Sequence, residues 1–325
     1  MQKAVTVVIP NWNGIRYLEN CLKSVLASDT EAEIIVVDNG STDGSEELVR
    51  KEFPSVKLVC FPENKGFSAA VNAGIALSEA PYIFLLNNDT LVRPDTIRRL
   101  LKEMRKNPRT FSCQALMLRM SDEKRVDSAG DFYCAAGWAF ALGKDRDAAD
   151  FERYTSRRRI FSSCAGAALY SRKILDEIGW FDEGHFAYLE DVDIGYRARI
   201  RGYENYVIKD AVVLHEGSAS SGSRYNDFKV RLSARNNIYL IYKNMPAFQI
   251  LLNLPFLIPG FLIKTFFFIR KGLGGSYLKG LREGFALCFT KGGRRHKIRF
   301  RKERLKTYAA IQLMLYLNLI RFLAA

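Results

Sequence analysis

The stretch YIFLLNNDT (residues 82–90) runs an apolar segment directly into two amides and a carboxylate. Its apolar part has the length and composition of a buried strand, and three similar runs precede it. These runs are VTVVIP (5–10), EIIVVD (33–38) and VKLVCF (56–61). Segments with helical periodicity lie between them, near residues 15–28, 44–53 and 67–79. This alternation predicts an α/β fold with a Rossmann-like, mostly parallel, twisted sheet flanked by helices.

Polar side chains follow each of these four predicted strands. They are Asn11, Asp38, Asn64 and the triplet Asn87, Asn88 and Asp89. In an open parallel sheet, ligands bind outside the carboxyl ends of the strands, so these side chains would meet at one crevice. Any one of them could instead be a turn former or a helix cap, because Asn and Asp favour such positions. Their presence at four consecutive strand ends favours a binding site.

Asp89 has the chemistry of a ligand for a divalent cation that shares its other coordination positions with a diphosphate. His215 follows another apolar run, VVLHEGSAS (212–220), and could complete the protein ligands. An imidazole beside a carboxylate would make Mn²⁺ as acceptable as Mg²⁺. The alternatives are a helix N-cap for Asp89, at a helix starting near Pro94, and a hydrogen-bonded core histidine for His215.

The formal net charge of +14 comes entirely from the last quarter of the chain. Residues 1–240 contain 33 basic and 33 acidic side chains, whereas residues 241–325 contain 16 basic and 2 acidic ones. Two long apolar segments, 248–269 and 308–325, flank the basic residues. This combination favours an anionic membrane surface as partner over a nucleic acid, which the neutral first 240 residues disfavour.

The segment 248–269 is long enough to cross a bilayer, which needs about 20 residues. A crossing would place either the sheet domain or the basic stretch outside the cytosol, against the positive-inside rule. We therefore expect residues 246–325 to form a basic, apolar, helical region that lies on or dips into the cytoplasmic leaflet of the cell membrane, as in a peripheral protein. The alternative is a helical subdomain whose apolar faces pack on the sheet domain.

The six cysteines form no CxxC pair, and no signal peptide precedes the first strand. This usage predicts a reduced, cytoplasmic chain with thiols buried as small core residues. The first strand is followed by IPNWNG rather than by a GxGxxG motif, which disfavours a dinucleotide-dependent dehydrogenase.

Six motifs occur in order along the chain. They are VVIPNWNG (7–14), VVDNGSTDGS (36–45), ENKGFSAAVNAGI (63–75), LLNNDT (85–90), CAGAALYSRKILDEIGWFDEGHFAYLEDVDIGYRARIRGY (164–203) and VVLHEGSAS (212–220). Together they resemble the inverting family-two glycosyltransferases with the GT-A fold, most closely their bacterial rhamnosyltransferase-like members. The resemblance covers about residues 1–245. It implies one domain with a nucleotide-sugar half to about residue 110 and an acceptor half over 111–245.

The resemblance also implies a binding site for a nucleotide-diphosphate sugar. Its residues would be Pro10, Asn11, Asp38, Asn64, Gly66, Asn87 and Asn88. Asn11 and Asp38 would hold the nucleotide, and Asn64 and Gly66 would lie along its ribose and diphosphate. Asp89 would take the metal of the family's DxD motif. Because this motif reads Asn-Asn-Asp here, one carboxylate remains to bind Mg²⁺ or Mn²⁺.

The family's acceptor motif, a carboxylate pair before a helix, appears as Glu190-Asp191. The resemblance assigns Asp191 as general base, because displacement at an anomeric carbon requires the acceptor hydroxyl to lose its proton. Glu190 is the second choice for the base and would otherwise contact the acceptor. Residues 190, 191 and 193 cannot share one helix face, so we expect Asp193 to be structural.

Two further residues have both a functional and a structural interpretation. Trp180 could offer the acceptor sugar an apolar face, or it could be a core residue. Arg235 could reach the diphosphate, since guanidinium groups fit phosphate oxygens, or it could lie on a solvated helix face.

The predicted function is inverting, metal-assisted transfer of a sugar from a nucleotide-diphosphate donor to a glycan or polyprenyl-diphosphate-linked acceptor, in cell-surface polysaccharide synthesis. By resemblance, dTDP-rhamnose is the first choice of donor. A UDP-hexose or galactofuranose transferase of the same fold is one alternative. A noncatalytic, membrane-associated protein that binds nucleotide sugars is the other.

Overall fold

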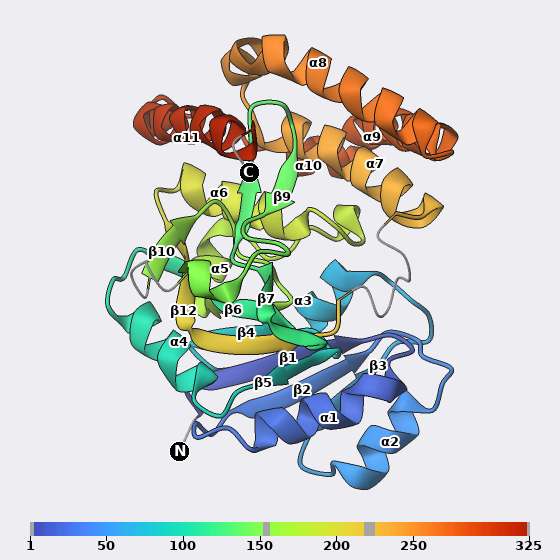
Figure 1. Ribbon diagram of the computed structural model, residues 1–325, viewed down its shortest axis with the longest axis vertical. Coiled ribbons are helices and arrows are strands. Elements are labelled where there is room, and N and C mark those ends of the chain that lie inside the picture. The colour runs from blue at the N-terminus through green and yellow to red at the C-terminus, as the bar shows by residue number, and fades with distance from the viewer. Residues whose placement is uncertain (1–2, 152–156, 218–224, 324–325) are drawn as a thin grey trace.

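The computed structural model describes residues 3–151, 157–217 and 225–323 (Figure 1). Its strands are β1 (Val5–Asn11), β2 (Glu33–Asp38), β3 (Lys57–Cys60), β4 (Tyr82–Leu86), β5 (Thr90–Val92), β6 (Thr110–Arg119), β7 (Asp122–Ser128), β8 (Asp131–Tyr133), β9 (Ala139–Ala141), β10 (Arg157–Ile160), β11 (Ala167–Ser171) and β12 (Glu204–His215). Its α-helices are α1 (Ile15–Leu26), α2 (Ser45–Glu52), α3 (Phe67–Leu77), α4 (Thr96–Arg105), α5 (Arg172–Ile178), α6 (Glu190–Ile200), α7 (Asp227–Asn244), α8 (Ala247–Arg270), α9 (Gly274–Phe289), α10 (Lys291–His296) and α11 (Leu305–Leu323). Short 3₁₀ helices cover Ala148–Phe151, Glu183–His185 and Lys302–Arg304.

The main sheet is open and has the strand order β10-β12-β6-β11-β4-β1-β2-β3. The strands β3, β2, β1 and β4 are parallel, as the alternation of apolar and helical segments predicts. β11 lies antiparallel between β4 and β6, and β6 is parallel to β12. The whole sheet is therefore mixed, although the strands of about the first 90 residues form the predicted parallel part.

Helices cover both faces of the sheet, as Figure 1 shows. On one face, side chains of α1, α2 and α4 pack in one core cluster with Val5, Val7 and Ile9 of β1. On the other face, α3, α5 and α6 pack with Val8. Because alternate residues of a strand point to opposite faces, a strand that is covered on both sides must be apolar throughout. This explains the continuous apolar runs in the sequence.

The C-terminal helices α8, α9 and α11 lie at the far end from the parallel strands (Figure 1). α8 buries Gln249, Asn253, Leu257 and Gly260, which recur every three or four residues and so form one face of the helix. Tyr196 of α6 donates a hydrogen bond to Gln249 at 2.7 Å, and Asn253 exchanges hydrogen bonds with Gln312 of α11 at 2.9 and 2.7 Å. The inward face of α8 is thus partly polar.

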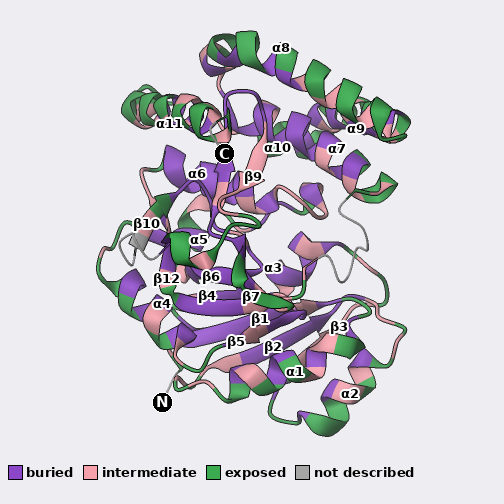
Figure 2. Cartoon of the chain, in the orientation of Figure 1, coloured by how far each residue is buried: buried purple, intermediate pink, exposed green. Residues whose placement is uncertain are grey.

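The outward faces of these helices are apolar. Exposed side chains include Leu251, Leu254, Ile258, Leu262, Ile263, Phe266 and Ile269 of α8, Leu278, Phe285 and Phe289 of α9, and Leu313, Leu317 and Ile320 of α11. Figure 2 shows the exposed colour along the outer side of α8 and α11. The alternative of a subdomain whose apolar faces pack on the sheet domain is therefore wrong for α8. By length and composition, α8 is the one helix of the described residues that could cross a membrane, and only 17% of its most apolar window is buried.

Candidate active site

The ends of β1, β2 and β4 are joined by a chain of side-chain hydrogen bonds. Asn88 Nδ2 donates to Asn11 Oδ1 at 2.6 Å, and Asn11 Nδ2 donates to Asp38 Oδ2 at 2.8 Å. All three residues are buried. A Cβ atom at Gly14 would overlap Asn88 Nδ2, which explains why glycine follows Asn11 in NWNG. The structure thus brings three of the predicted donor-binding residues together at the expected edge of the sheet, next to Pro10 of β1.

Asn64 and Gly66 lie beside this edge and are held by Asn39. Asn39 Nδ2 donates to Asn64 Oδ1 at 3.0 Å and to the Gly66 carbonyl at 3.1 Å. Gly66 has a φ of +89°, and a Cβ atom there would lie 2.6 Å from Phe186. Only glycine therefore fits where the donor half touches the loop before α6. Asn39 is a missed residue of this edge, although it stands within the motif VVDNGSTDGS.

Asp89 does not cap a helix. The chain continues from it into β5, which pairs with the end of β12 so that Thr90 lies opposite His215. α4 begins later, at Thr96, after Asp95. The register places Asp89 Oδ1 3.3 Å from His215 Nε2. Apart from this ion pair, the buried carboxylate oxygen has no partner, so a cation could take the position between Asp89 Oδ1 and His215 Nε2.

Asp127 at the end of β7 completes this group. Its Oδ2 lies 2.7 Å from His215 Nδ1, on the opposite side of the ring from Asp89. Burial alone would lower the pKa of His215, but hydrogen bonds with Asp127 and Asp89 raise it to about 9. Burial alone would raise the pKa of Asp127, but the His215 contact outweighs it and lowers this pKa to about 2. The protonated imidazole ring thus bridges two carboxylates, with one N–H toward each.

The same three residues fit a divalent cation. A carboxylate that accepts the Nδ1 proton leaves Nε2 of the histidine free for a metal, which is the usual arrangement around metal-binding histidines. Asp89 Oδ1 and His215 Nε2 would then hold the cation in place of the ring proton. Asp127, which the sequence did not single out, would orient the ring.

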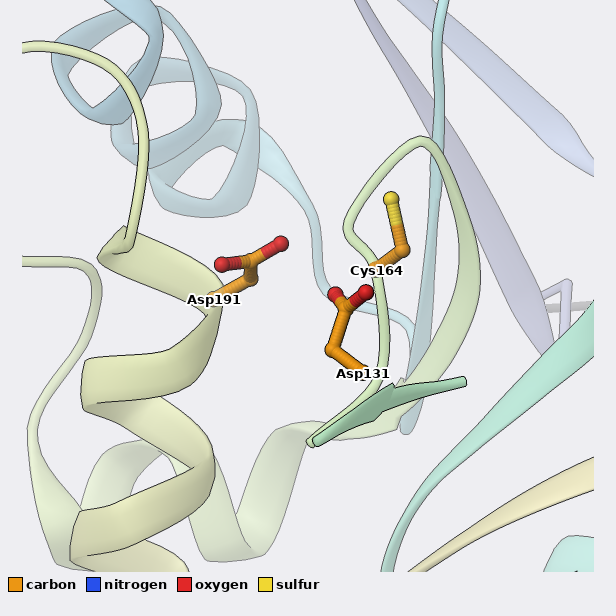
Figure 3. Close-up of side chains that lie close together, drawn as sticks. All are labelled: Asp131, Cys164 and Asp191. Atoms are coloured by element: carbon orange, nitrogen blue, oxygen red, sulfur yellow. The ribbon is translucent and has the colours of Figure 1, made fainter. Parts of the chain in front are cut away.

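Asp191, in the first turn of α6, lies opposite Asp131 at the start of β8. Figure 3 shows these two carboxyl groups with Cys164, and one ligand atom from each of the three lies within 4.8 Å of the others. Asp191 Oδ1 accepts a hydrogen bond from the Val192 backbone N–H at 2.7 Å. Asp131 was missed because nothing in the turn SAGDFY distinguishes it from an ordinary loop acid.

These two carboxyl groups share a proton. Burial raises the pKa of Asp131 well above its ordinary value, and the negative charge of Asp191 raises it further. Burial also raises the pKa of Asp191, but a hydrogen bond from Asp131 partly offsets this rise. Asp131 therefore carries the proton and donates it to an Asp191 carboxylate, because like charges this close do not both ionise. Asp191 is left as an oriented proton acceptor.

The two groups of acids lie near each other. Burial is the largest cause of the raised pKa of Asp131, followed by Asp191 and Glu190. The negative charge of Asp127 raises this pKa further. The Asn87 backbone N–H donates to the Gly166 carbonyl at 2.9 Å, so the end of β4 touches the turn that carries Cys164. The predicted cation ligands and the predicted base are thus linked through Asp127 and through this turn.

Two other clusters resemble metal sites by composition only. Burial raises the pKa of Cys164 well above its ordinary value, which disfavours the thiolate that would bind a metal beside Asp131 and Asp191. Asp182, His185 and Asp193 also lie within 4.8 Å of one another. Lys243 Nζ contacts Asp182 at 2.6 Å and Asp193 at 2.8 Å, so an ammonium group already neutralises these carboxylates.

The loop before α6 is strained and clamped. Phe186, Tyr188 and Leu189 have φ values of 63°, 70° and 67°, which non-glycine residues rarely adopt. Asn236 of α7 donates to the carbonyls of His185, Ala187 and Tyr188 at 2.7 to 2.8 Å. Backbone strain of this kind is typical of functional sites. Asn236, a second missed residue, fixes the loop that delivers the acid pair.

Glu190, which follows this loop, is buried and its Oε2 has no hydrogen-bond partner. Burial raises its pKa well above the ordinary value, and the charge of Asp191 adds to this effect. Asp193 accepts hydrogen bonds from Arg197 at 2.9 Å and from Lys243 and Asn244 at 2.8 Å, which is the predicted structural role.

Trp180 and Arg235 contact other parts of the protein. Trp180 Nε1 donates to Asp176 Oδ1 at 2.8 Å, and the guanidinium group of Arg172 lies 5.1 Å from the Trp180 ring centroid. These contacts hold Trp180 against α5 and do not join it to the acid pair. Arg235 is half-buried and donates to the Gly184 carbonyl, so its interpretation as a solvated helix-face residue is wrong. Contact of Arg235 with a diphosphate stays a prediction. The last three residues of VVLHEGSAS, 218–220, lie outside the described residues.

The sequence model described as Glycosyl transferase family 2 matches residues 6–179, more than half of the chain. The chain belongs to glycosyl transferase family 2. An N-acetylglucosaminyl-diphospho-decaprenol L-rhamnosyltransferase of Mycobacterium tuberculosis (strain ATCC 25618 / H37Rv) is 28% identical to this family member over 249 residues, which are 68% of this chain and 79% of the relative. A chondroitin synthase of Pasteurella multocida is 31% identical over 113 residues, which are 34% of this chain and 12% of the synthase.

Solved structures resemble the whole fold of this family-2 glycosyltransferase. GalNAc-T7, solved with UDP, GalNAc and Mn²⁺, superposes with a TM-score of 0.58 at 16% identity, over 74% of this chain and 48% of its own. The mannosyltransferase PcManGT from Pyrobaculum calidifontis, solved with GDP-Man and Mn²⁺, gives a TM-score of 0.53 at 19% identity, over 97% of this chain and 85% of its own. These similarities confirm the predicted GT-A fold.

Proposed function

We propose that this glycosyltransferase inverts the anomeric centre of its donor and uses a divalent cation. The observation that carries the proposal is the placement of Asp191 in the first turn of α6, beside Asp131 and oriented by the Val192 backbone N–H. One oriented base suits direct displacement by an acceptor hydroxyl. A double displacement with retention would need a nucleophilic side chain as well as a base.

In this mechanism, each residue of the crevice has one task. Asn11, Asp38 and Asn88 bind the donor nucleotide at the sheet edge. Asp89 and His215 would hold Mg²⁺ or Mn²⁺, which would supply positive charge opposite the departing diphosphate. Asp191 accepts the proton of the acceptor hydroxyl while the hydroxyl oxygen bonds to the anomeric carbon and the bond to the diphosphate breaks. The Asp131 carboxyl group donates a hydrogen bond to Asp191 and keeps it oriented.

We further propose dTDP-rhamnose as the donor and a polyprenyl-diphosphate-linked sugar as the acceptor. The similarity to the mycobacterial decaprenol-linked rhamnosyltransferase supports both choices. A UDP-hexose or a galactofuranose donor is the alternative, since the contacts of Asn11 and Asp38 do not distinguish one base or sugar from another.

The outward apolar face of α8, α9 and α11 supports a position on the cytoplasmic face of the membrane. Leu251, Leu262 and Phe266 of α8 are 66%, 64% and 61% exposed, whereas Gln249 and Asn253 of the same helix are fully buried. Such an arrangement is unfavourable in water and favourable against lipid. The proposal is a peripheral enzyme whose apolar helices rest in one leaflet, where a lipid-linked acceptor would be confined.

The test is a transfer assay with purified full-length protein, dTDP-rhamnose, Mn²⁺ and a short-chain polyprenyl-diphosphate sugar. The expected product carries the opposite anomeric configuration to the donor, read from the one-bond C1–H1 coupling constant in NMR. A product with the donor's configuration would refute inversion. UDP-glucose, UDP-galactose and UDP-galactofuranose serve as alternative donors, and Asp191→Asn serves as the inactive control. Donor binding without turnover in any combination would favour a noncatalytic protein.

A further inference from the structure

A second charged pocket lies away from the crevice, between the C-terminal end of α6 and residues 295–304. It has a volume of about 420 Å³. Eight of its eleven lining residues are Arg, Lys or His, the other three are Ile, and none is acidic. At about 1.5 Å per residue, α6 separates its Arg201 end from Asp191 by about 15 Å. This basic pocket is therefore distinct from the site of the donor diphosphate.

Only part of this positive charge is neutralised by the protein. Arg197 pairs with Asp193 at 2.9 Å, Arg201 with Glu177 at 3.2 Å and His296 with Asp182 at 3.1 Å. The other basic lining residues form no ion pair with a carboxylate among the residues that the structure describes. They are Arg295, Lys297, Arg299, Arg301 and Arg304.

The crowding of these cations acts on Arg304. Burial lowers the pKa of Arg304, and the charges of Arg201 and Arg301 lower it further. Mutual repulsion of this kind destabilises the free protein, and a bound anion would relieve it.

The basic pocket is built into the fold. The Ile298 backbone N–H donates to the Lys243 carbonyl at 2.8 Å, and Thr307 Oγ1 donates to the Ile200 carbonyl at 3.0 Å. The ring of Phe300 packs 5.3 Å from Phe248 of α8 and 5.6 Å from Tyr308 of α11. These contacts fix residues 298–307 against α6, α7 and the apolar helices, unlike a loose basic tail.

We infer that the basic pocket is a binding site for the phosphate group of an anionic membrane phospholipid. Several arginines around one cavity suit phosphate oxygens, which accept two hydrogen bonds from each guanidinium group. Phe300 and Leu305 stand beside these arginines and are 41% and 55% exposed, so apolar surface adjoins the phosphate position. A free phosphate ion has no apolar part that could contact this surface, whereas a phospholipid has acyl chains that could.

This inference extends the proposed membrane contact from general charge attraction to one defined site. It does not depend on which sugar is transferred. The test compares the full-length protein with two double variants that lose the same charge. Arg299→Gln with Arg301→Gln changes the basic pocket, whereas Lys279→Gln with Arg282→Gln changes exposed residues of α9 outside it.

Binding is measured by co-flotation with vesicles of phosphatidylglycerol and phosphatidylcholine, and with pure phosphatidylcholine as the neutral reference. Hydrogen bonds to charged groups contribute about 1.5–3 kcal/mol each, so the pocket variant should lose about a hundredfold or more in affinity for anionic vesicles. The α9 variant should lose about thirtyfold at most, at about 1 kcal/mol for each basic residue near an anionic surface. Equal losses in the two variants would overturn the inference.

A second measurement distinguishes lipid from free phosphate. Inorganic phosphate at constant ionic strength is tested for a rise in the melting temperature of each protein. A rise that depends on Arg299 and Arg301, together with equal vesicle binding by all proteins, would overturn the lipid assignment. Release of nucleoside diphosphate in solution should be unchanged in both variants, so failure of this inference is distinguishable from failure of the proposed transfer reaction.

Discussion

Replacing Asp131 by Asn should make the protein more stable in a way that depends on pH. In the fold, burial and the neighbouring Asp191 raise the pKa of Asp131, so this group binds a proton that the unfolded chain releases above about pH 3.9. The stability that the protonated form contributes is fully present below that value. It is lost progressively as the pH rises toward the folded pKa. The amide that replaces the carboxyl group cannot ionise, so the variant does not lose this stability.

The magnitude follows from proton linkage. Within this window, each pH unit removes up to about 1.4 kcal/mol from the wild-type free energy of unfolding. The advantage of Asp131→Asn should therefore grow by up to about 3 kcal/mol between pH 5 and pH 7. Because Asp131 keeps some contact with solvent, this slope is an upper limit.

The assay is equilibrium unfolding in urea at pH 5, 6, 7 and 8, with EDTA present so that no cation occupies the crevice. Asp210→Asn is the matched control, since Asp210 is an exposed acid of β12. Its effect should stay within about 0.5 kcal/mol at every pH. Wild-type and Asp131→Asn curves that remain parallel from pH 5 to pH 8 would refute the shared proton, and with it the assignment of Asp191 as the ionised partner.

Four further predictions follow from the site and its supports. Asp191→Asn should lower kcat by about 10²–10⁴-fold, while the affinity for a nucleoside diphosphate, measured by calorimetry, stays within about a factor of two. Undiminished turnover would exclude Asp191 as the base. Asp127→Ala should raise the Mn²⁺ concentration for half-maximal activity by about 10–100-fold, because His215 loses the partner that orients it, and an unchanged Mn²⁺ titration would contradict the assigned cation site. Lys243→Met should destabilise the fold by about 3–5 kcal/mol in urea unfolding, since Asp182 and Asp193 lose their shared cation, and a loss below about 1 kcal/mol would show that other contacts neutralise them. The double variant Leu262→Ser, Phe266→Ser should shift the protein from the membrane pellet to the soluble fraction. Its melting temperature should change by no more than about 2 °C, because both side chains are exposed. Unchanged pelleting would contradict a lipid contact through α8.

Much of the fold over about residues 1–110 could be predicted from local sequence patterns. Continuous apolar runs and period-3.6 apolar repeats depend on residues close together in the chain, so the strands over 5–11, 33–38 and 82–86 and the intervening helices match their predicted positions. The convergence of Asn11, Asp38 and Asn88 also follows from sequence, because the parallel order of neighbouring strands puts their carboxyl ends at one edge.

The residues that give this edge its chemistry depend on contacts between distant parts of the chain. Asp127 and Asp131 reach His215 and Asp191 only because β11 inserts between β4 and β6 and β12 pairs with β6, a strand order that no local pattern indicates. Asn236 holds the loop before α6 across about fifty intervening residues. The proton shared by the acid pair is likewise a property of burial and proximity, which exist only after folding.

The C-terminal quarter shows the same division. Its sequence determined that the segment 248–269 is an apolar helix near an excess of basic charge, since composition and periodicity are carried by the chain itself. Only the tertiary structure decided that Gln249 and Asn253 face inward and Leu262 and Phe266 outward, and that the basic residues surround a pocket. The physical reason is that a helix of nearly uniform hydrophobicity has no preferred face of its own. Its orientation is set by the hydrogen-bond partners, Tyr196 and Gln312, that other helices present to it.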